Sequence, residues 1–380
     1  MPASNLSVGM KIYDNDWHLR HGLEPQAAAD LLADMGVTWV IAQSRYLPMA
    51  DSAVESAVRQ QDLTRYATLD DVAFRERLRE RGIAYFAVLN ICFDPGYAAA
   101  HPDLLPIDQF GRREEMQDWY IGLPPDRKDN IGQKAAMLTE ATRALKPDGI
   151  HLGFIRWPGF WETWLSDVDR ARMPDYCYSR PTLTRFASEN GLDIPVDDPL
   201  AAARLIAERH RAQWRDWKCG VTAEAIAAIR KDIARVDPAV RISINTVPLF
   251  KTDFDNAVEE VFGQDVARLR EVVDVFEVMA YHQIMRQPAG WPAAVAADIR
   301  ARSGQTTVCT LQARPLYLDG MHAGRGRSAT LSPEEFALAV NGVEKSDIDG
   351  LCVFTFTDFL ELRHTAAGQK MIERLRRFRR

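Results

Sequence analysis

Short apolar runs alternate with amphipathic segments along the chain. Because the runs are almost continuously apolar, they predict strands buried on both faces of a parallel sheet. The segments between them repeat apolar residues every three or four positions, which is typical of helices packed against such a sheet. The predicted strands are 9–13, 37–42, 83–89, the start of 148–162, 241–245, 273–280, 307–311 and 350–356.

Helical segments follow the strands in regular alternation. Gly36 and Gly82 stand where a helix C-cap glycine belongs, and Ser332 with Glu335 has the spacing of a capping box. The predicted helices are 24–35, 69–81, 130–145, 200–236 with Gly220 as a candidate break, 258–272, 291–302, 333–343 and 366–378.

Eight strands alternating with eight helices predict an α/β fold, a (β/α)8 TIM barrel that forms one domain over residues 1–380. An open doubly wound sheet is the alternative. Such a sheet normally carries a Gly-rich phosphate turn after its first strand, whereas residues 14–17 here read DNDW. Two long loop insertions, 91–128 and 157–199, are expected at the carboxyl face, and the aromatic content of the first argues against disorder.

The stretch 148–162, which reads DGIHLGFIRWPGFWE, is the centre of the functional prediction. Its apolar positions form a buried strand that leads directly into polar and aromatic residues. In a (β/α)8 barrel the active site lies at the carboxyl ends of the strands, so polar side chains just beyond each predicted strand are expected to meet there. They include carboxylates, amides and guanidinium groups flanked by Trp, which suits a carbohydrate whose rings stack on aromatics while polar groups bind its hydroxyls.

Composition narrows the possible partners. The chain has 380 residues, 47% of them hydrophobic and 26% charged, with a formal net charge of −6. Neither a nucleic-acid surface nor a membrane surface is indicated. The N-terminal stretch lacks the pattern of a secretory signal, so a cytoplasmic location is expected. The five cysteines are odd in number and widely spaced, which predicts neither disulfides nor a zinc site, and no cofactor is expected.

Three motifs carry a family resemblance. The run DGIHLGFIRWP resembles the fourth strand of glycosyl-hydrolase-like (β/α)8-barrel proteins, of the family-10-like and other uncharacterised glycoside hydrolase families, and more distantly that of the chitinase type. DVFEVMAYH at 274–282 resembles their Met-x-Tyr sixth strand, and HPDLLPIDQFGR with WYIGLPPDR resembles their long third loop. The chain departs from these families at Gly153, where an acidic residue usually stands, and at Gln312 and Arg314, where the large retaining clan has Glu.

The catalytic carboxylates must therefore be other residues. Glu277 is the first choice, because it shares a strand face with Tyr281 and burial would raise its pKa; the alternative is a structural ion pair with a barrel Arg or Lys. Glu162 is the second choice, with a solvated helix N-terminus as its alternative. Asp16 and Asp358 complete the predicted catalytic set, although Asp before a helix is often only a cap.

The predicted substrate-binding residues lie at or near the strand ends. Arg156 is the strongest of them, since a guanidinium beside Trp can hold a carboxylate or paired hydroxyls; a loop-anchoring ion pair is its alternative. His151 lies within a strand and is more simply explained as an interior His with a structural partner. The full predicted set is Arg156, Trp157, His151, Tyr281, His282, Asn90, Arg45 and Asp14.

These features predict a glycoside hydrolase that cleaves an O-glycosidic bond of an oligo- or polysaccharide by carboxylate acid/base catalysis. A non-catalytic carbohydrate-binding barrel is the main alternative, because Gly153 replaces the usual acid and a fold does not fix a function. A metal-dependent hydrolase would need a set of His ligands at the strand ends, and no such set is present in the sequence. The oligomeric state cannot be predicted from one chain.

Overall fold

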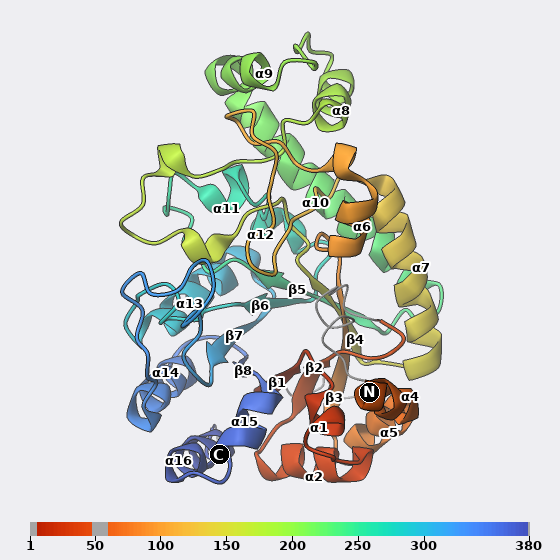
Figure 1. Cartoon of the computed structure of the whole chain (residues 1–380), viewed down its shortest axis with the longest axis vertical. Helices are drawn as coiled ribbons and strands as arrows, with labels where there is room; N and C mark the ends of the chain where they lie inside the picture. Colours follow the sequence, from red (N-terminus) through yellow and green to blue (C-terminus); the bar gives the residue numbers. More distant parts are fainter. Residues whose placement is uncertain (1–5, 48–59, 379–380) are drawn as a thin grey trace.

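The computed structural model describes residues 6–47 and 60–378. Its strands close into a parallel barrel in the order of the sequence, with β8 paired to β1 (Figure 1). The strands are β1 Val8–Ile12, β2 Trp39–Ala42, β3 Ala84–Asn90, β4 Gly149–Gly153, β5 Arg241–Thr246, β6 Val275–Val278, β7 Thr306–Gln312 and β8 Gly350–Phe354. The predicted (β/α)8 barrel is confirmed, and the doubly wound alternative is excluded.

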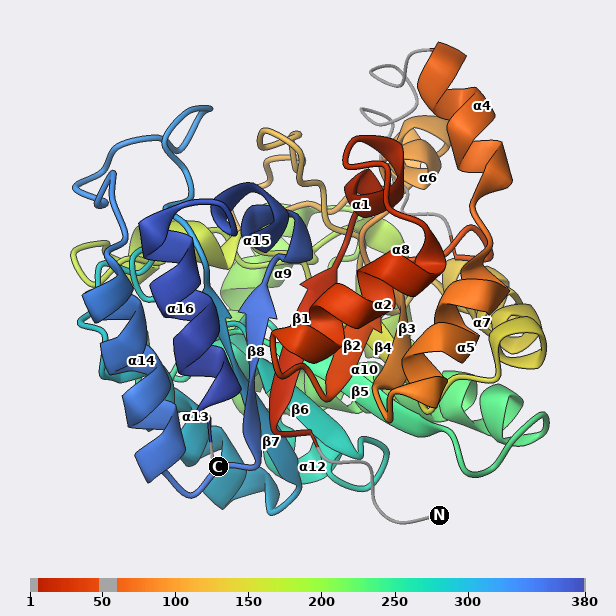
Figure 2. The same ribbon diagram turned by 90° about the horizontal axis from the view of Figure 1, so that it is seen from below.

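Helices surround this barrel on the outside (Figures 1 and 2). The longer ones are α2 Pro25–Asp34, α4 Gln60–Thr68, α5 Asp71–Glu80, α7 Lys128–Leu145, α8 Arg180–Asn190, α10 Arg211–Ala234, α13 Trp291–Ser303, α14 Pro333–Lys345 and α16 Ala366–Arg376. The shorter ones are α1 Asp16–Leu19, α6 Pro95–Ala100, η1 Pro102–Leu104, η2 Trp161–Thr163, η3 Arg170–Arg172, α9 Pro199–Leu205, α11 Ala257–Glu260, α12 Val266–Leu269 and α15 Phe356–Leu362. In the part of the chain that the structure describes, no helix is long and apolar enough to cross a membrane.

Some predicted helices differ from the observed ones. The segment 200–236 is interrupted by a π-helical turn, η4 Ile206–His210, and not at Gly220, which lies inside α10. The segment 258–272 forms two short helices, because Asp265 caps a new helix start by accepting hydrogen bonds from Ala267 and Arg268. Ser332 caps α14 as predicted. Its capping box is incomplete, since the Glu335 carboxylate instead binds His282 and Gln283.

The inside of the barrel is divided into two parts. Apolar side chains such as Trp39, Phe86 and Val275 fill the part near the amino-terminal ends of the strands. Nearer the carboxyl ends the interior is polar, with Lys11 and Glu277 as an ion pair. The interior is therefore apolar at the amino-terminal ends of the strands and polar toward their carboxyl ends. The carboxyl ends form the mouth of the barrel, and α1 and α15 lie at this end (Figure 2).

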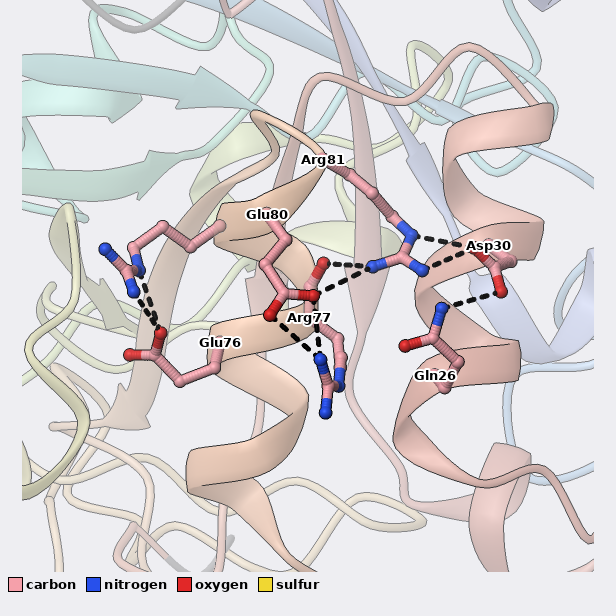
Figure 3. A network of polar contacts seen from close by, with 7 residues as sticks. Gln26, Asp30, Glu76, Arg77, Glu80 and Arg81 are labelled. Atoms are coloured by element: carbon pink, nitrogen blue, oxygen red, sulfur yellow. Dashed lines mark hydrogen bonds and ion pairs between the residues drawn. The ribbon is translucent and has the colours of Figure 1, made fainter.

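On the outer surface, α2 and α5 lie side by side and are joined by charged side chains (Figure 3). Arg81 Nε donates a 2.8 Å hydrogen bond to Asp30 Oδ1, and Gln26 donates a 3.1 Å bond to the other oxygen of the same carboxylate. Arg77 pairs with Glu80 at 2.8 Å along α5. Exposed pairs of this kind contribute little to stability, so the helices are held mainly by their buried faces, with residues such as Leu32 and Leu78 in the core.

Candidate active site

The chain turns sharply where β4 reaches the barrel mouth. Phe154 takes a left-handed conformation with φ of 55°, which is uncommon for a residue with a side chain. Its amide donates a 3.0 Å hydrogen bond to Asn245 Oδ1 at the end of β5. Farther on, the Gly159 amide donates to the Tyr120 hydroxyl at 3.1 Å. These bonds fix the path of the strand exit toward η2, which carries Glu162.

Glu162 is a buried carboxyl group at this exit. Its residue is only 6% exposed, and its Oε2 atom has no hydrogen-bond partner among the described residues. Burial raises the pKa of Glu162 to about 7, although the positive charge of Arg156 and a hydrogen bond with Tyr317 act in the opposite direction. A carboxyl group with this pKa carries a proton below neutral pH and can donate it.

Arg156 lies close to Glu162 and is also buried, with 2% of its surface exposed. Its guanidinium stands 4.7 Å from the centre of the Phe154 ring. Within the described part of the chain, its Nε and Nη1 atoms have no hydrogen-bond partner and it forms no ion pair within 4.0 Å. The loop-anchoring ion pair considered from the sequence is therefore absent from the described structure, and two guanidinium nitrogens are left to donate to a ligand.

The loop after β7 closes over Glu162. Arg327 donates hydrogen bonds to the backbone carbonyls of Glu162 at 2.6 Å, His322 at 2.6 Å and Ile284 at 2.9 Å. Its guanidinium also lies 5.2 Å from the centre of the Tyr317 ring. One side chain therefore links the loops that follow β4, β6 and β7, and it holds Tyr317 next to Glu162.

Glu277 lies below the mouth, inside the barrel. It is fully buried, its Oε1 atom is 3.0 Å from Lys11 Nζ, and it accepts a hydrogen bond from the Thr310 hydroxyl. Burial alone would lower the pKa of Lys11, but the nearby Glu277 carboxylate, with smaller effects of Tyr13, Tyr281 and Cys352, acts in the opposite direction and the pKa is raised. The structural ion pair, offered from the sequence as the alternative for Glu277, is present in the structure, and this geometry favours it over proton transfer to a substrate. The catalytic prediction for Glu277 stays a prediction.

The acidic residues after β1 and β8 have different environments. The Asp14 Oδ1 atom accepts hydrogen bonds from the Thr357 hydroxyl at 2.7 Å and from the Asp16 amide at 3.0 Å. Asp16 forms a 3.2 Å ion pair with Arg20, and burial and the nearby Asp14 raise its pKa. A carboxylate that accepts hydrogen bonds and lies at a strand end, as Asp14 does, can act as the ionised member of a catalytic pair.

Asp358 is held by structural partners on both carboxylate oxygens. It completes a capping box with Thr355, whose amide donates to Oδ2 at 2.9 Å, and its Oδ1 atom lies 2.7 Å from Arg314 Nε. Burial raises the pKa of Asp358 to about 6, with Arg314 opposing the shift. This geometry favours the cap that was considered from the sequence as the alternative.

Three predicted substrate-binding residues are bound to other protein groups in the structure. Trp157 is fully buried and donates a 3.0 Å hydrogen bond to the Lys218 carbonyl on α10. His282 lies 2.9 Å from a carboxylate oxygen of Glu335. Arg45 pairs with Asp71 at 3.1 Å and holds the start of α5. Their place just beyond a strand end, as aromatic or polar side chains, was the signal for binding, and this signal is the same for residues that anchor loops.

The remaining predicted residues lie in or just below the mouth. His151 is fully buried and its Nδ1 is 3.0 Å from the Ser243 hydroxyl; burial and the nearby Lys11 lower its pKa well below the usual value. These contacts agree with the interior His considered from the sequence. Tyr281 is 6% exposed, and its hydroxyl accepts a 3.4 Å bond from Lys11. Asn90 fills the space beside β4, where a Cβ on Gly153 would come within 2.4 Å of its Oδ1.

Several residues of the site were not predicted. Tyr317 and Arg327 come from the loop after β7, which has no apolar periodicity to mark it. Glu114, in the insertion after β3, is 3% exposed, and neither of its carboxylate oxygens has a side-chain partner among the residues that the structure describes. Burial raises the pKa of Glu114 to about 8. Only the tertiary packing of the long loops reveals these residues, because their sequence neighbours are ordinary loop residues.

Across 6–47 and 60–378, no group of three or more His, Cys, Asp or Glu side chains is arranged to hold a metal ion. The five cysteines are all free and buried, and burial raises the pKa of the Cys92 and Cys219 thiols to about 12. Buried thiols of this kind behave as small hydrophobic side chains.

Comparisons with known proteins agree on the fold. No protein-family model and no curated protein matches the sequence. The PgaB (BpsB) glycoside hydrolase domain from Bordetella bronchiseptica is similar in structure, with a TM-score of 0.65 at 15% identity over 97% of this chain and 99% of that one. The catalytic domain of β-amylase from Paenibacillus polymyxa has a TM-score of 0.60 at 12% identity, over 98% of both chains.

A β-galactosidase from Bacillus circulans sp. alkalophilus is also similar, with a TM-score of 0.62 at 12% identity over 99% of this chain. The chain spans 56% of that enzyme, so its match is limited to one part of a longer protein. At these identities the likeness establishes the fold. The protein is therefore a (β/α)8 barrel whose structural neighbours are glycoside hydrolases.

Proposed function

We propose that this protein is a glycoside hydrolase that cleaves an O-glycosidic bond of an oligo- or polysaccharide, with Glu162 as the proton donor. The observation that carries the proposal is the environment of Glu162. It is a buried carboxyl group at the exit of β4, its pKa is raised to about 7, and one of its oxygens has no hydrogen-bond partner in the described part of the chain. A departing sugar oxygen is a strong base and needs a proton. The glycoside hydrolases among the structural neighbours support this chemistry by analogy of fold.

Arg156 and Tyr317 both act on Glu162. Their charge and hydrogen bond moderate the pKa that burial alone would give, so the group can both hold a proton near neutral pH and release it. Arg156 also offers Nε and Nη1, which have no partner among the described residues, as donors to hydroxyl or carboxylate oxygens of the sugar.

The ionised partner in this proposal is Asp14. Its carboxylate follows β1 directly, accepts hydrogen bonds from Thr357 and Asp16, and forms no ion pair within the described residues. Hydrogen bonds donated to a carboxylate stabilise its negative charge. Asp14 would then act as base or nucleophile while Glu162 protonates the leaving oxygen, and Asp16, Asp358 and Glu277 would support the site without contacting the sugar.

The test is release of reducing ends from a panel of plant, bacterial and fungal polysaccharides by the purified protein and its variants. Glu162→Gln and Asp14→Asn are each expected to reduce kcat by about a hundredfold or more. Glu115→Gln is the matched control, because Glu115 is an exposed carboxylate in the insertion after β3, and it should leave the rate unchanged. Rates in Glu162→Gln equal to those of the unaltered protein would reject the proposal.

A non-catalytic carbohydrate-binding barrel is the second candidate. The observation in its favour is the packing at Gly153, where the Asn90 carboxamide occupies the space that an acidic side chain on β4 would need. Equilibrium binding separates the two functions. Tight binding of a glycan by the unaltered protein, with no cleavage of that glycan over days, would favour the binding barrel.

A further inference from the structure

An exposed Trp side chain stands on a rigid aromatic base beside the candidate site. Trp119, in the insertion after β3, is 40% exposed. Its ring is in edge-to-face contact with Phe93 and Phe160 at 5.8 Å and with Tyr120 and Phe154 at 5.9 Å between centroids. Four surrounding rings therefore hold the indole in one orientation, while two fifths of the side chain stays in contact with water.

The turn that carries Trp119 is itself fixed. Gln117 and Tyr120 exchange backbone hydrogen bonds of 2.8 and 2.9 Å across it. The Asp118 carboxylate accepts a 2.8 Å bond from the Met321 amide, and the Gln117 side chain lies 3.2 Å from the His322 ring nitrogen Nε2. The loop after β3 is thereby joined to the loop after β7, so the position of Trp119 is set before any ligand arrives.

Two of the four rings around Trp119 also contact residues of the Glu162 site. Phe154 contacts Trp119 and also lies under the Arg156 guanidinium. Phe160 contacts Trp119 and lies 6.0 Å from the ring of Tyr317, the hydrogen-bond partner of Glu162. One aromatic ring, Phe154 or Phe160, thus lies between the exposed indole and Arg156 or Tyr317. The indole is therefore next to the site and outside it, where a second unit of the same ligand could bind.

We propose that Trp119 is a stacking platform for a pyranose ring, which makes the ligand an oligo- or polysaccharide chain that extends from the Glu162 site toward the rim of the barrel. This inference rests on the proposed carbohydrate function and deepens it. A fixed indole loses little conformational entropy on binding. The apolar face of a sugar ring that stacks on it covers the exposed indole surface and excludes water from it. A monosaccharide would occupy the inner site and leave Trp119 uncovered.

Binding measured separately from cleavage tests the platform. The probes are an immobilised array of mono- and oligosaccharides, followed by titration calorimetry with the oligosaccharide that the unaltered protein retains best. Trp119→Ala is expected to weaken binding of that oligosaccharide by about tenfold or more, and Trp119→Phe should restore part of the loss. Phe110→Ala is the matched control, because Phe110 is a 41% exposed aromatic residue of the same insertion, and its affinity should be unchanged.

Two results would overturn the inference. One is retention of no oligosaccharide by the unaltered protein. The other is equal affinity of Trp119→Ala and the unaltered protein, with thermal melting showing that the variant is folded. Binding that depends on Trp119 without any cleavage would support the platform and reject the hydrolase, so failure of the two proposals can be distinguished.

Discussion

The Lys11 ammonium lies 3.0 Å from the Glu277 carboxylate inside the barrel, where the two side chains are only 1% and 0% exposed. The pair joins β1 to β6 across the interior, and the Thr310 hydroxyl on β7 donates to the same carboxylate. A buried pair of this kind is costly to break, because removal of one partner leaves an uncompensated charge in a medium that solvates it poorly.

We therefore expect Glu277→Gln to lower the free energy of unfolding by roughly 3–5 kcal/mol, measured by urea denaturation. The double variant Lys11→Met with Glu277→Leu should be much closer to the unaltered protein, because it leaves no unpaired charge. If Glu277→Gln keeps full stability and loses its activity, Glu277 is catalytic as the sequence predicted, and the structural interpretation is wrong.

Glu114 should make the stability of the protein depend on pH. Burial raises the pKa of Glu114 from 4.5 to about 8, so the folded state binds a proton more tightly than the unfolded state does. Its contribution to stability is full below about pH 4.5 and is lost as the pH rises to about 8. Glu114→Gln should therefore match the unaltered protein at pH 5 and be more stable at pH 9, at roughly 1.4 kcal/mol per unit of pKa shift.

Thermal and denaturant melts from pH 5 to pH 9 measure this effect. Glu115→Gln serves as the control, since Glu115 is the exposed neighbour of Glu114, and it should give the same pH profile as the unaltered protein. Equal stability of the Glu114→Gln and unaltered proteins at every pH would show that Glu114 titrates normally.

The rate of hydrolysis should fall at alkaline pH. Because the pKa of Glu162 is raised to about 7, the proton that it donates is present below this value and is lost above it. The plot of kcat/KM against pH should therefore descend through about pH 7. A flat profile from pH 6 to pH 9 would indicate that no group with this pKa takes part.

Replacing Arg156 should move this descending limb. The positive charge of Arg156 lowers the pKa of Glu162 against the effect of burial. Arg156→Met is expected to shift the limb to higher pH and to raise KM, since the donors to the sugar are also lost. Arg185→Met offers a control, because Arg185 pairs with Glu189 and Glu224 on the outer helices. If the descending limb of Arg156→Met is not shifted, the charge of Arg156 does not affect the pKa of Glu162.

The sequence was sufficient for the barrel because most strands carry a nearly continuous apolar run, which must be buried on both faces, and eight such segments alternate with helices. It was less informative about which polar side chains face the mouth. Glu277 and His151 lie on strands and point into the barrel interior, and Trp157 turns away to pack against Trp217 at 5.7 Å. All three are residue types that are common in binding sites, so the sequence alone could not distinguish them from residues that contact a ligand.

The long loops were the main source of unpredicted site residues. Tyr317 and Arg327 reach Glu162 from a segment more than a hundred residues away in sequence, and nothing local marks their role. Glu162 itself was predicted from its place between two Trp residues after β4. Its burial depends on the closure of those loops, which pattern alone does not reveal.

The central claim is that Glu162 donates a proton to the leaving oxygen, and the choice of leaving group tests it most directly. A sugar alkoxide needs that proton, whereas a dinitrophenolate departs without one. With an oligosaccharide substrate, Glu162→Gln should reduce kcat/KM by about a hundredfold to ten-thousandfold. With the dinitrophenyl glycoside of the same sugar, the variant should retain nearly full activity. Equal losses on both substrates would contradict the assignment of Glu162 as the proton donor.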